Sequence, residues 1–270
     1  MAHRARPWII GGCLLVLSLV PGCGATVTPP APVFLTMAGS TSMEPLLTEL
    51  ASAYSAQHPH IDFDIQGGGS QLGLDLVNEG QADIGLVSWP PPNLPDDLRL
   101  VPIARDGIAI ILNPQNRLAG LSLPVLRDIF SGQLLDWREI DGPPLPIQVV
   151  SREDGSGARA AFEAIVMADQ PVTPTAIVLP NSRAVVNFVA QTPNAIAYVS
   201  SGFVGDDVYV VPIEGVRPTL DDIDSRSYPL TRDLAMITSQ QNNPEANRFV
   251  DFSLSPAGQA IVGQGWGRVR

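Results

Sequence analysis

The chain has 270 residues, of which 45% are hydrophobic, and it carries a formal net charge of -11. This length and composition allow one large hydrophobic core or two moderate ones. The acidic balance, with no block of basic residues, argues against a nucleic-acid partner. All 16 basic residues are arginines, which excludes a Walker-type phosphate loop and Schiff-base chemistry.

The N-terminal segment has the pattern of an export signal. Arg4 and Arg6 precede an apolar run over residues 8–20, which is short for a membrane span. The run leads into Val20-Pro21-Gly22-Cys23 and resembles a bacterial lipoprotein signal, with a signal peptide over residues 1–22 and a lipidated Cys23. An uncleaved anchor and an ordinary secretory signal are the alternatives. Residues 23–32 would tether an extracytoplasmic domain to the cell membrane.

Apolar periodicity predicts strands alternating with helices. The predicted strands are residues 33–37, 61–65, 83–87, 108–112, 147–150, 195–199 and 208–213. The first predicted helix has Ser42 as its N-cap. The second follows the loop 66–70, with Leu72, Leu76 and Val77 inward and a stop at Gly80. Further helices are predicted over residues 122–131, 159–168 and 182–190, and from residue 244 with a break at Pro256. This alternation predicts an α/β fold with largely parallel sheets.

One local pattern occurs three times: a strand, a loop rich in Gly and Ser, and the start of a helix. The three loops are residues 39–42, 67–70 and 154–157. Ligands of open α/β sheets bind outside the carboxyl ends of the strands, where such loops gather. We therefore expect three helix N-termini to meet at one point.

The third loop, residues 151–158, has the composition of an anion site. Ser156 and Gly157 stand where the first free backbone N–H groups of a helix point outward, and Arg152 offers a fork of donors to two oxygens of one ligand. A buried guanidinium needs a partner, and Glu153 or Asp154 is near enough in sequence to provide one. The alternative is that the serines only cap helices and that Arg152 is a surface residue.

Other chemistries fit the sequence less well. The nucleophile elbow of hydrolases needs Gly two residues before the Ser, and Asp154 holds that place before Ser156. His58 and His60 flank a proline far from Ser156 and are interpreted as loop residues. The acidic cluster 221–224 lacks the glycine and terminal Glu of a calcium loop. We expect no enzymatic activity, no metal and no cofactor.

An ordered set of motifs resembles the phosphate-binding proteins of bacterial ABC transporters. The motifs span nearly all of the chain after the predicted signal. They are Ala38-Gly39-Ser40-Thr41-Ser42, Gly67-Gly68-Gly69-Ser70, residues 82–88, Ser151-Arg152-Glu153-Asp154-Gly155-Ser156-Gly157, Phe130-Ser131-Gly132-Gln133 with Asp136-Trp137, residues 194–199, Tyr228-Pro229-Leu230-Thr231-Arg232 and residues 254–259.

The resemblance implies a two-lobed periplasmic-binding-protein fold of type II, which closes on inorganic phosphate and delivers it to an ABC permease. It implies lobe one over residues 33–105 plus 205–270, lobe two over 106–204, two crossover strands as the hinge, and a monomer. The phosphate ligands would be Ser40, Thr41, Ser42, Ser70, Ser88, Arg152, Ser156, Gly157 and the backbone of Ala158, with Asp154 steadying Arg152.

The chain departs from the family pattern at two positions. Ala158 stands where many members have Thr, which removes one hydroxyl donor. At Ser88 some members have an Asp that accepts the proton of monohydrogen phosphate and rejects fully ionised oxyanions such as sulfate, and a serine repels sulfate far less. Phosphate is the first choice of ligand. The alternatives are another oxyanion, or an interaction or signalling lipoprotein of the same fold that binds none tightly.

Overall fold

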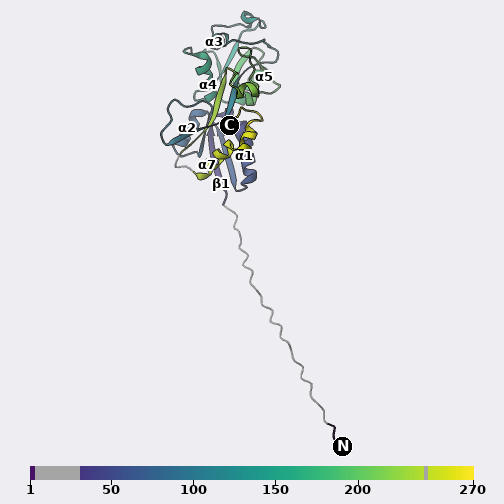
Figure 1. The fold of residues 1–270 in the computed structure, drawn as a ribbon. Helices are drawn as coiled ribbons and strands as arrows, with labels where there is room; N and C mark the ends of the chain where they lie inside the picture. Colours follow the sequence, from purple (N-terminus) through teal and green to yellow (C-terminus); the bar gives the residue numbers. More distant parts are fainter. Residues whose placement is uncertain (4–30, 240–242) are drawn as a thin grey trace. The chain divides into compact units, whose positions relative to one another are not determined.

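A computed structural model describes residues 1–3, 31–239 and 243–270. Residues 4–22 of the predicted signal peptide, the predicted lipidation site Cys23 and all but the last two residues of the predicted tether lie outside these described residues. Residues Pro32–Arg270 form one compact unit, and the fold below is that unit (Figure 1). No helix among the described residues is long and apolar enough to cross a membrane.

The unit is a mixed α/β fold built on nine strands. The strands are β1 (Val33–Gly39), β2 (Ile61–Gly67), β3 (Ile84–Val87), β4 (Leu98–Leu112), β5 (Gln148–Arg152), β6 (Ile177–Leu179), β7 (Ala195–Ser200), β8 (Tyr209–Val210) and β9 (Thr231–Ser239). Their order is β2-β1-β3-β9-β4-β7-β5-β6, with β8 paired to β4. β1 pairs in parallel with β2 and β3, and β5 with β6 and β7, whereas the pairs of β9 and β4 are antiparallel.

Helices flank the sheet at both ends of the unit. The α-helices are α1 (Glu44–Gln57), α2 (Ser70–Asn78), α3 (Leu123–Ser131), α4 (Gly157–Phe162), α5 (Ser182–Gln191), α6 (Leu220–Asp224), α7 (Pro244–Leu254) and α8 (Pro256–Val262). Short 3-10 turns cover Thr41–Met43, Trp137–Ile140 and Ser201–Phe203, and a π-helical turn covers Glu163–Met167. Figure 1 shows α1, α2 and α7 at one end and α3, α4 and α5 at the other.

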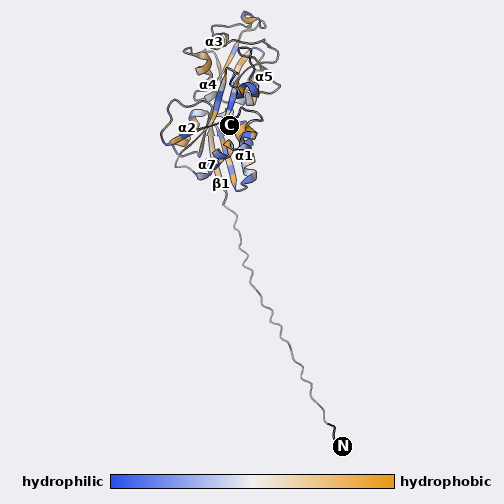
Figure 2. Cartoon of the chain, viewed as in Figure 1, coloured by the Kyte–Doolittle hydropathy of each residue, from blue (hydrophilic) through white to orange (hydrophobic). Residues whose placement is uncertain are grey.

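The hydrophobic core consists of separate clusters. One cluster packs α1 and α7 on β1, β3 and β9, with Leu46, Met236 and Phe249 at 0% exposure. A second packs α3 and α4 on the far half of β4 and on β7, and it includes residues 211, 213, 228 and 230. Smaller clusters cover the opposite faces under α2 and under α5. Figure 2 shows orange, hydrophobic stretches within both the strands and the helices.

The strand β4 joins the two ends of the sheet. Residues 98–107 pair with β9, and residues 108–112 pair with β7. The predicted strand 108–112 is therefore only the second part of a strand of 15 residues. The first part of this strand is Leu98-Arg99-Leu100-Val101-Pro102. It follows a proline-rich turn and itself contains a proline, and proline weakens the sequence pattern that indicates a strand.

Most predicted helix boundaries are confirmed, including the stop at Gly80 and the break at Pro256. The inward position of Leu72 is wrong, since Leu72 is 39% exposed and Leu74 is buried instead. The N-cap role of Ser42 is also wrong: Ser42 lies within a 3-10 turn, and α1 starts after Met43. Pro45, in the first turn of α1, fixes this late start.

Three further differences concern the strands. The predicted strand 208–213 shrinks to the two residues of β8, and β9 and β6 were not predicted. β9 lies at the centre of the sheet and reads as a strand only from Leu234 onward, because Arg232 and Asp233 precede the apolar run. The sheet is mixed rather than largely parallel, since β9 enters antiparallel between β3 and β4.

Candidate functional site

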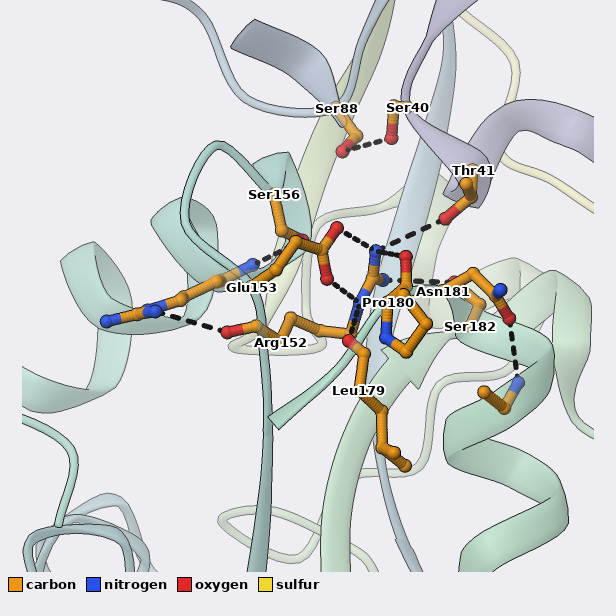
Figure 3. A network of polar contacts seen from close by, with 12 residues as sticks. Ser40, Thr41, Ser88, Arg152, Glu153, Ser156, Leu179, Pro180, Asn181 and Ser182 are labelled. Carbon is orange, nitrogen blue, oxygen red and sulfur yellow. Dashed lines mark hydrogen bonds and ion pairs between the residues drawn. The ribbon is translucent and has the colours of Figure 1, made fainter. Parts of the chain in front are cut away.

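Buried hydroxyl groups from four elements gather around one arginine (Figure 3). Ser40 and Thr41 follow β1, Ser70 begins α2, Ser88 follows β3, and Ser156 precedes α4. Each of these five side chains is at most 8% exposed, although a hydroxyl group is normally solvated at a loop. The elements converge because β1, β2 and β3 run parallel and end at the same edge.

Hydrogen bonds connect the segments to one another. The backbone N–H of Ser88 donates to Oγ of Ser70 at 3.1 Å, and Oγ of Ser40 donates to Oγ of Ser88 at 2.8 Å. The N–H of Gln71 donates to the carbonyl of Gly155 at 3.2 Å, which joins the start of α2 to the third loop. The prediction that the three Gly/Ser-rich loops meet is therefore confirmed.

Arg152 is the last residue of β5, and its side chain lies beside this group with 2% exposure. Its Nη2 donates to Oγ1 of Thr41 at 3.3 Å, and its Nη1 donates to Oγ of Ser182 at 3.4 Å. Nε also donates to the carbonyl of Leu179 at 3.1 Å. Arg152 is therefore a strand residue held from several sides, rather than part of the predicted loop 151–158.

The partner that steadies Arg152 is Glu153. Its two carboxylate oxygens accept from Nε and Nη2 of Arg152, both at 2.8 Å, which is the bidentate geometry of a strong pair. The prediction that Asp154 has this role is wrong. The Asp154 side chain is 94% exposed and pairs with Arg159 at 2.6 Å. The carboxylate directly after the strand turns back to the guanidinium, whereas the next one lies in a turn at Gly155.

Tyr198 supports Arg152 from β7. Its hydroxyl accepts from the backbone N–H of Arg152 at 3.3 Å and shares a hydrogen bond with Oγ of Ser151 at 2.8 Å. Burial raises the pKa of the Tyr198 phenol to about 12, so the hydroxyl stays protonated at neutral pH. The ring stacks on Phe162 of α4 with centroids 4.2 Å apart. Tyr198 thereby links the end of β5 to the helix that follows it.

A second buried arginine, Arg232 of β9, contacts the site at Ser88. Its Nη1 donates to Oγ of Ser88 at 3.2 Å. Nε and Nη2 both donate to Oδ2 of Asp106, at 3.0 and 2.8 Å, and both side chains are 0% exposed. Asp106 also accepts from the hydroxyls of Ser200 and Ser201.

Sequence reasoning did not assign a role to Arg232 or Asp106. Arg232 appeared only within the motif Tyr228–Arg232, and Asp106 only as the first residue of the second lobe. The sequence does contain a signal for the pairing of Asp106 with Arg232. Each of these charged residues borders an apolar run that forms a buried strand, and a buried charge is retained only if it is paired. The register of β4 and β9 sets Asp106 directly opposite Arg232.

The hydroxyl groups are arranged as donors toward the space between them. Thr41 accepts from Arg152, Ser70 accepts from the N–H of Ser88, and Ser156 accepts from the N–H of Arg159 at 3.4 Å as the N-cap of α4. A hydroxyl that accepts from the protein keeps its own proton to donate elsewhere. The first N–H groups of α2 and α4 have no acceptor within their helices and carry the positive end of the helix dipole.

Gly157 brings the N-terminus of α4 against these hydroxyls. A Cβ at this position would overlap Oγ of Ser70 and lie 2.5 Å from Oγ of Ser88. No larger residue fits here without separating the segments. The backbone of Gly157 is therefore as much part of the site as the side chains around it.

Three predicted residues have other surroundings than expected. Ser40 uses its proton on Ser88, so it supports another hydroxyl. Ser42 is buried, and its Oγ has no partner among the described residues. Ala158 is 1% exposed and packs with Phe162 in a hydrophobic cluster, so the space for a hydroxyl at this position lies against the core.

A small cavity of about 180 Å³ adjoins this group. Ser70, Ser156 and Gly157 line one side, and Trp89 with the prolines that follow it lines another. Among the described residues, no group of three or more His, Cys, Asp or Glu could hold a metal ion.

Comparisons with known proteins identify the family. Residues 26–257 match the PBP superfamily domain. The phosphate-binding protein PstS of Bacillus subtilis is 31% identical over 223 residues, which are 81% of this chain and 74% of that protein. The chain belongs to the family of phosphate-binding proteins of ABC transporters. Members of this family are binding proteins rather than enzymes.

Solved structures of the family have the same fold. A phosphate ABC transporter substrate-binding protein from Clostridium perfringens, solved with bound phosphate, is 33% identical with a TM-score of 0.83, and the match covers 88% of this chain and all of that one. An ABC-type phosphate transport receptor from Vibrio cholerae is 30% identical with a TM-score of 0.72, over 86% and 99% of the two chains. The chain thus has the same fold as these two proteins of phosphate transport.

Proposed function

We propose that the protein is a lipid-anchored extracytoplasmic receptor that captures inorganic phosphate for an ABC importer. The observation that carries the proposal is the set of buried hydroxyls of Thr41, Ser70, Ser88 and Ser156, which accept hydrogen bonds from the protein and keep their protons to donate. A tetrahedral oxyanion needs many donors and a positive potential. The relative from Clostridium perfringens carries phosphate, which supports this ligand.

The charge of the site suits a dianion that must lose its water. Arg152 and Arg232 supply two guanidinium groups, and the starts of α2 and α4 add N–H donors and partial positive charge. Glu153 and Asp106 balance the charges of the two arginines by direct ion pairs. The arginines are thereby held in place while the ligand side presents donors. The ligand residues we propose are Thr41, Ser42, Ser70, Ser88, Arg152, Ser156, Gly157 and the backbone of Ala158, with Ser40 behind Ser88.

Capture would follow from closure of two lobes around the ligand. Lobe one consists of residues from Val33 to about Arg105, and lobe two begins at Asp106, within β4. The sequence put the return to lobe one near residue 205, and we now propose it near Thr231, because residues 211–230 pack with the α3 and α4 cluster. β4 and the start of β9 then form the hinge, since β4 has residues in both core clusters and β9 begins directly after Leu230 of the second cluster.

The proposed membrane attachment rests on the sequence Val20-Pro21-Gly22-Cys23. Lipidation of Cys23 would keep a monomeric receptor at the outer face of the membrane, within reach of an ABC permease. Labelling of the protein with a radioactive fatty acid in a bacterial host tests this part separately. The label is expected in the full chain and not in a Cys23→Ala variant, and equal label in both would contradict the anchor.

Calorimetry of residues 32–270 with phosphate, sulfate and arsenate tests the ligand. We expect phosphate to bind at one site per chain. We expect the Arg152→Ala variant to lose several kcal/mol of binding free energy, because the substitution removes a buried charge-assisted pair. Arg117→Ala, which lies outside the site, is the matched control for loss of an arginine. If no oxyanion releases heat, the protein is an interaction or signalling lipoprotein that keeps the fold.

A further inference from the structure

The inference concerns Ser88 and its two donors, and it rests on the proposed function. A serine oxygen has two lone pairs and one proton. Oγ of Ser88 accepts from Oγ of Ser40 at 2.8 Å and from Nη1 of Arg232 at 3.2 Å. Both lone pairs are therefore occupied. The proton of Ser88 is left as the only group that this side chain can offer to a ligand.

Burial makes this arrangement stable. Ser88, Arg232 and Asp106 are at most 1% exposed, so water cannot replace either donor. Asp106 holds the guanidinium by two short contacts and is in turn held by Ser200 and Ser201. An arginine cannot lose its proton in this setting and can only donate. Ser88 thus has a fixed role, whereas a serine in water is free to donate or accept.

We propose that Arg232, positioned by Asp106, fixes Ser88 as a hydrogen-bond donor, so that the site selects doubly charged tetrahedral oxyanions with an unprotonated oxygen at this position, sulfate included. A carboxylate at position 88 would accept a ligand proton and repel an unprotonated oxygen. The hydroxyl of Ser88, as a donor, instead favours an unprotonated ligand oxygen. Monohydrogen phosphate would bind with its proton turned away from Ser88.

Other charged groups around the site do not supply an acceptor at this point. From β5 comes the Arg152 and Glu153 pair, in which the carboxylate is used by the guanidinium. From α4 comes Arg159, which pairs with Asp154 and Glu163. From β4 and β9 come Asp106 and Arg232 themselves. Each of these carboxylates is thus paired with an arginine.

The test measures phosphate and sulfate affinity by calorimetry for four proteins: the unchanged chain, Ser88→Asp, the charge-neutral double variant Asp106→Asn with Arg232→Gln, and a control double variant. The control is Arg226→Gln with Asp233→Asn, which removes an exposed ion pair from the region next to Arg232. Circular dichroism confirms folding of each variant. The quantity compared is the ratio of the sulfate to the phosphate dissociation constant.

We expect sulfate to bind the unchanged chain and the ratio to rise at least about tenfold in Ser88→Asp, because like charges then face each other. The Asp106/Arg232 double variant is expected to raise the ratio as well, since Ser88 regains a free lone pair. The control variant is expected to keep the ratio. In the unchanged chain, phosphate affinity should rise with pH through the second ionisation of phosphate, while sulfate affinity should not.

Two results would overturn different claims. If the unchanged chain binds phosphate but its ratio equals that of Ser88→Asp and of the Asp106/Arg232 variant, Ser88 is not held as a donor and this inference is wrong. If the unchanged chain binds neither anion, the proposed function itself is wrong. Because the readout is a ratio, a variant that is merely less stable lowers both affinities together and leaves the ratio unchanged.

Discussion

Gly157 lies so close to Ser70 that a side chain at position 157 would occupy the space of the Ser70 hydroxyl. The two residues are 87 positions apart in the sequence and belong to different helix starts, α4 and α2. Their contact is the point at which the two halves of the proposed phosphate site meet. Its tightness depends on the absence of a Cβ, since the backbone φ of Gly157 is not in the left-handed region.

The first prediction is that Gly157→Ala lowers phosphate affinity by at least about a hundredfold while the protein stays folded. Alanine is a better helix former than glycine, so α4 is not weakened, but its methyl group forces Ser70 and Ser88 away from the helix start. Calorimetry with phosphate and thermal unfolding without it measure the two effects. Gly205→Ala is the control, because a Cβ at Gly205 meets nothing within 4 Å. Unchanged affinity in Gly157→Ala would contradict the proposed site.

The second prediction separates two neighbouring carboxylates. Glu153→Gln is expected to weaken phosphate binding about tenfold or more, because it loosens the bidentate hold on Arg152. Asp154→Asn is expected to change the affinity less than about twofold, since an exposed ion pair contributes little. Calorimetry at one ionic strength measures both. A larger effect of the Asp154 variant would restore the role that the sequence suggested for that residue.

The third prediction concerns Tyr198. Tyr198→Phe removes the hydroxyl that accepts from the backbone of Arg152 and contacts Ser151, and the free energy of unfolding is expected to fall by about 1–3 kcal/mol, as for a buried polar group left unpaired. Urea unfolding measures this loss. Tyr209→Phe is the control, since its hydroxyl donates to the carbonyl of Leu118 at a partly buried position outside the site. Equal losses in both variants would argue against a special role for Tyr198.

The fourth prediction concerns acid stability at Glu245. Burial favours a raised pKa for this carboxyl, but hydrogen bonds from Tyr54 at 2.5 Å and Arg248 at 2.6 Å outweigh it and hold the pKa below its usual range. A group whose pKa is lowered by folding adds stability above its unfolded pKa, and this stability is lost as the pH falls through the folded value.

Glu245→Gln should therefore lower stability near neutral pH and flatten the loss of stability between about pH 5 and the folded pKa. The free energy of unfolding, measured in urea from neutral to acid pH, checks this shape. Glu49→Gln, a substitution at an exposed position of α1, is expected to follow the unchanged chain. If the free energy of unfolding falls as steeply with decreasing pH in Glu245→Gln as in the unchanged chain, other groups determine the acid stability.

Local patterns in the sequence were enough to locate much of the site. Each Gly/Ser-rich loop between a strand and a helix is a local feature, and parallel strands bring such loops to one edge. Ser70 and Ser156 follow from that rule, and Arg152 lies next to the third loop. Ser88 was named only through the ordered motifs, which identified the family. The strand and helix alternation likewise predicted the α/β class, because apolar periodicity is a property of short segments.

Pairings between distant residues were decided by the tertiary structure. Asp106 and Arg232 are 126 positions apart and become cross-strand neighbours only through the register of β4 and β9. The choice of Glu153 over Asp154 depends on where β5 ends and the turn begins, and that boundary is set by pairing with β6 and β7. The sequence determined which donors are present. The packing of distant strands determined which carboxylate holds each arginine, because that depends on side-chain directions that no local pattern contains.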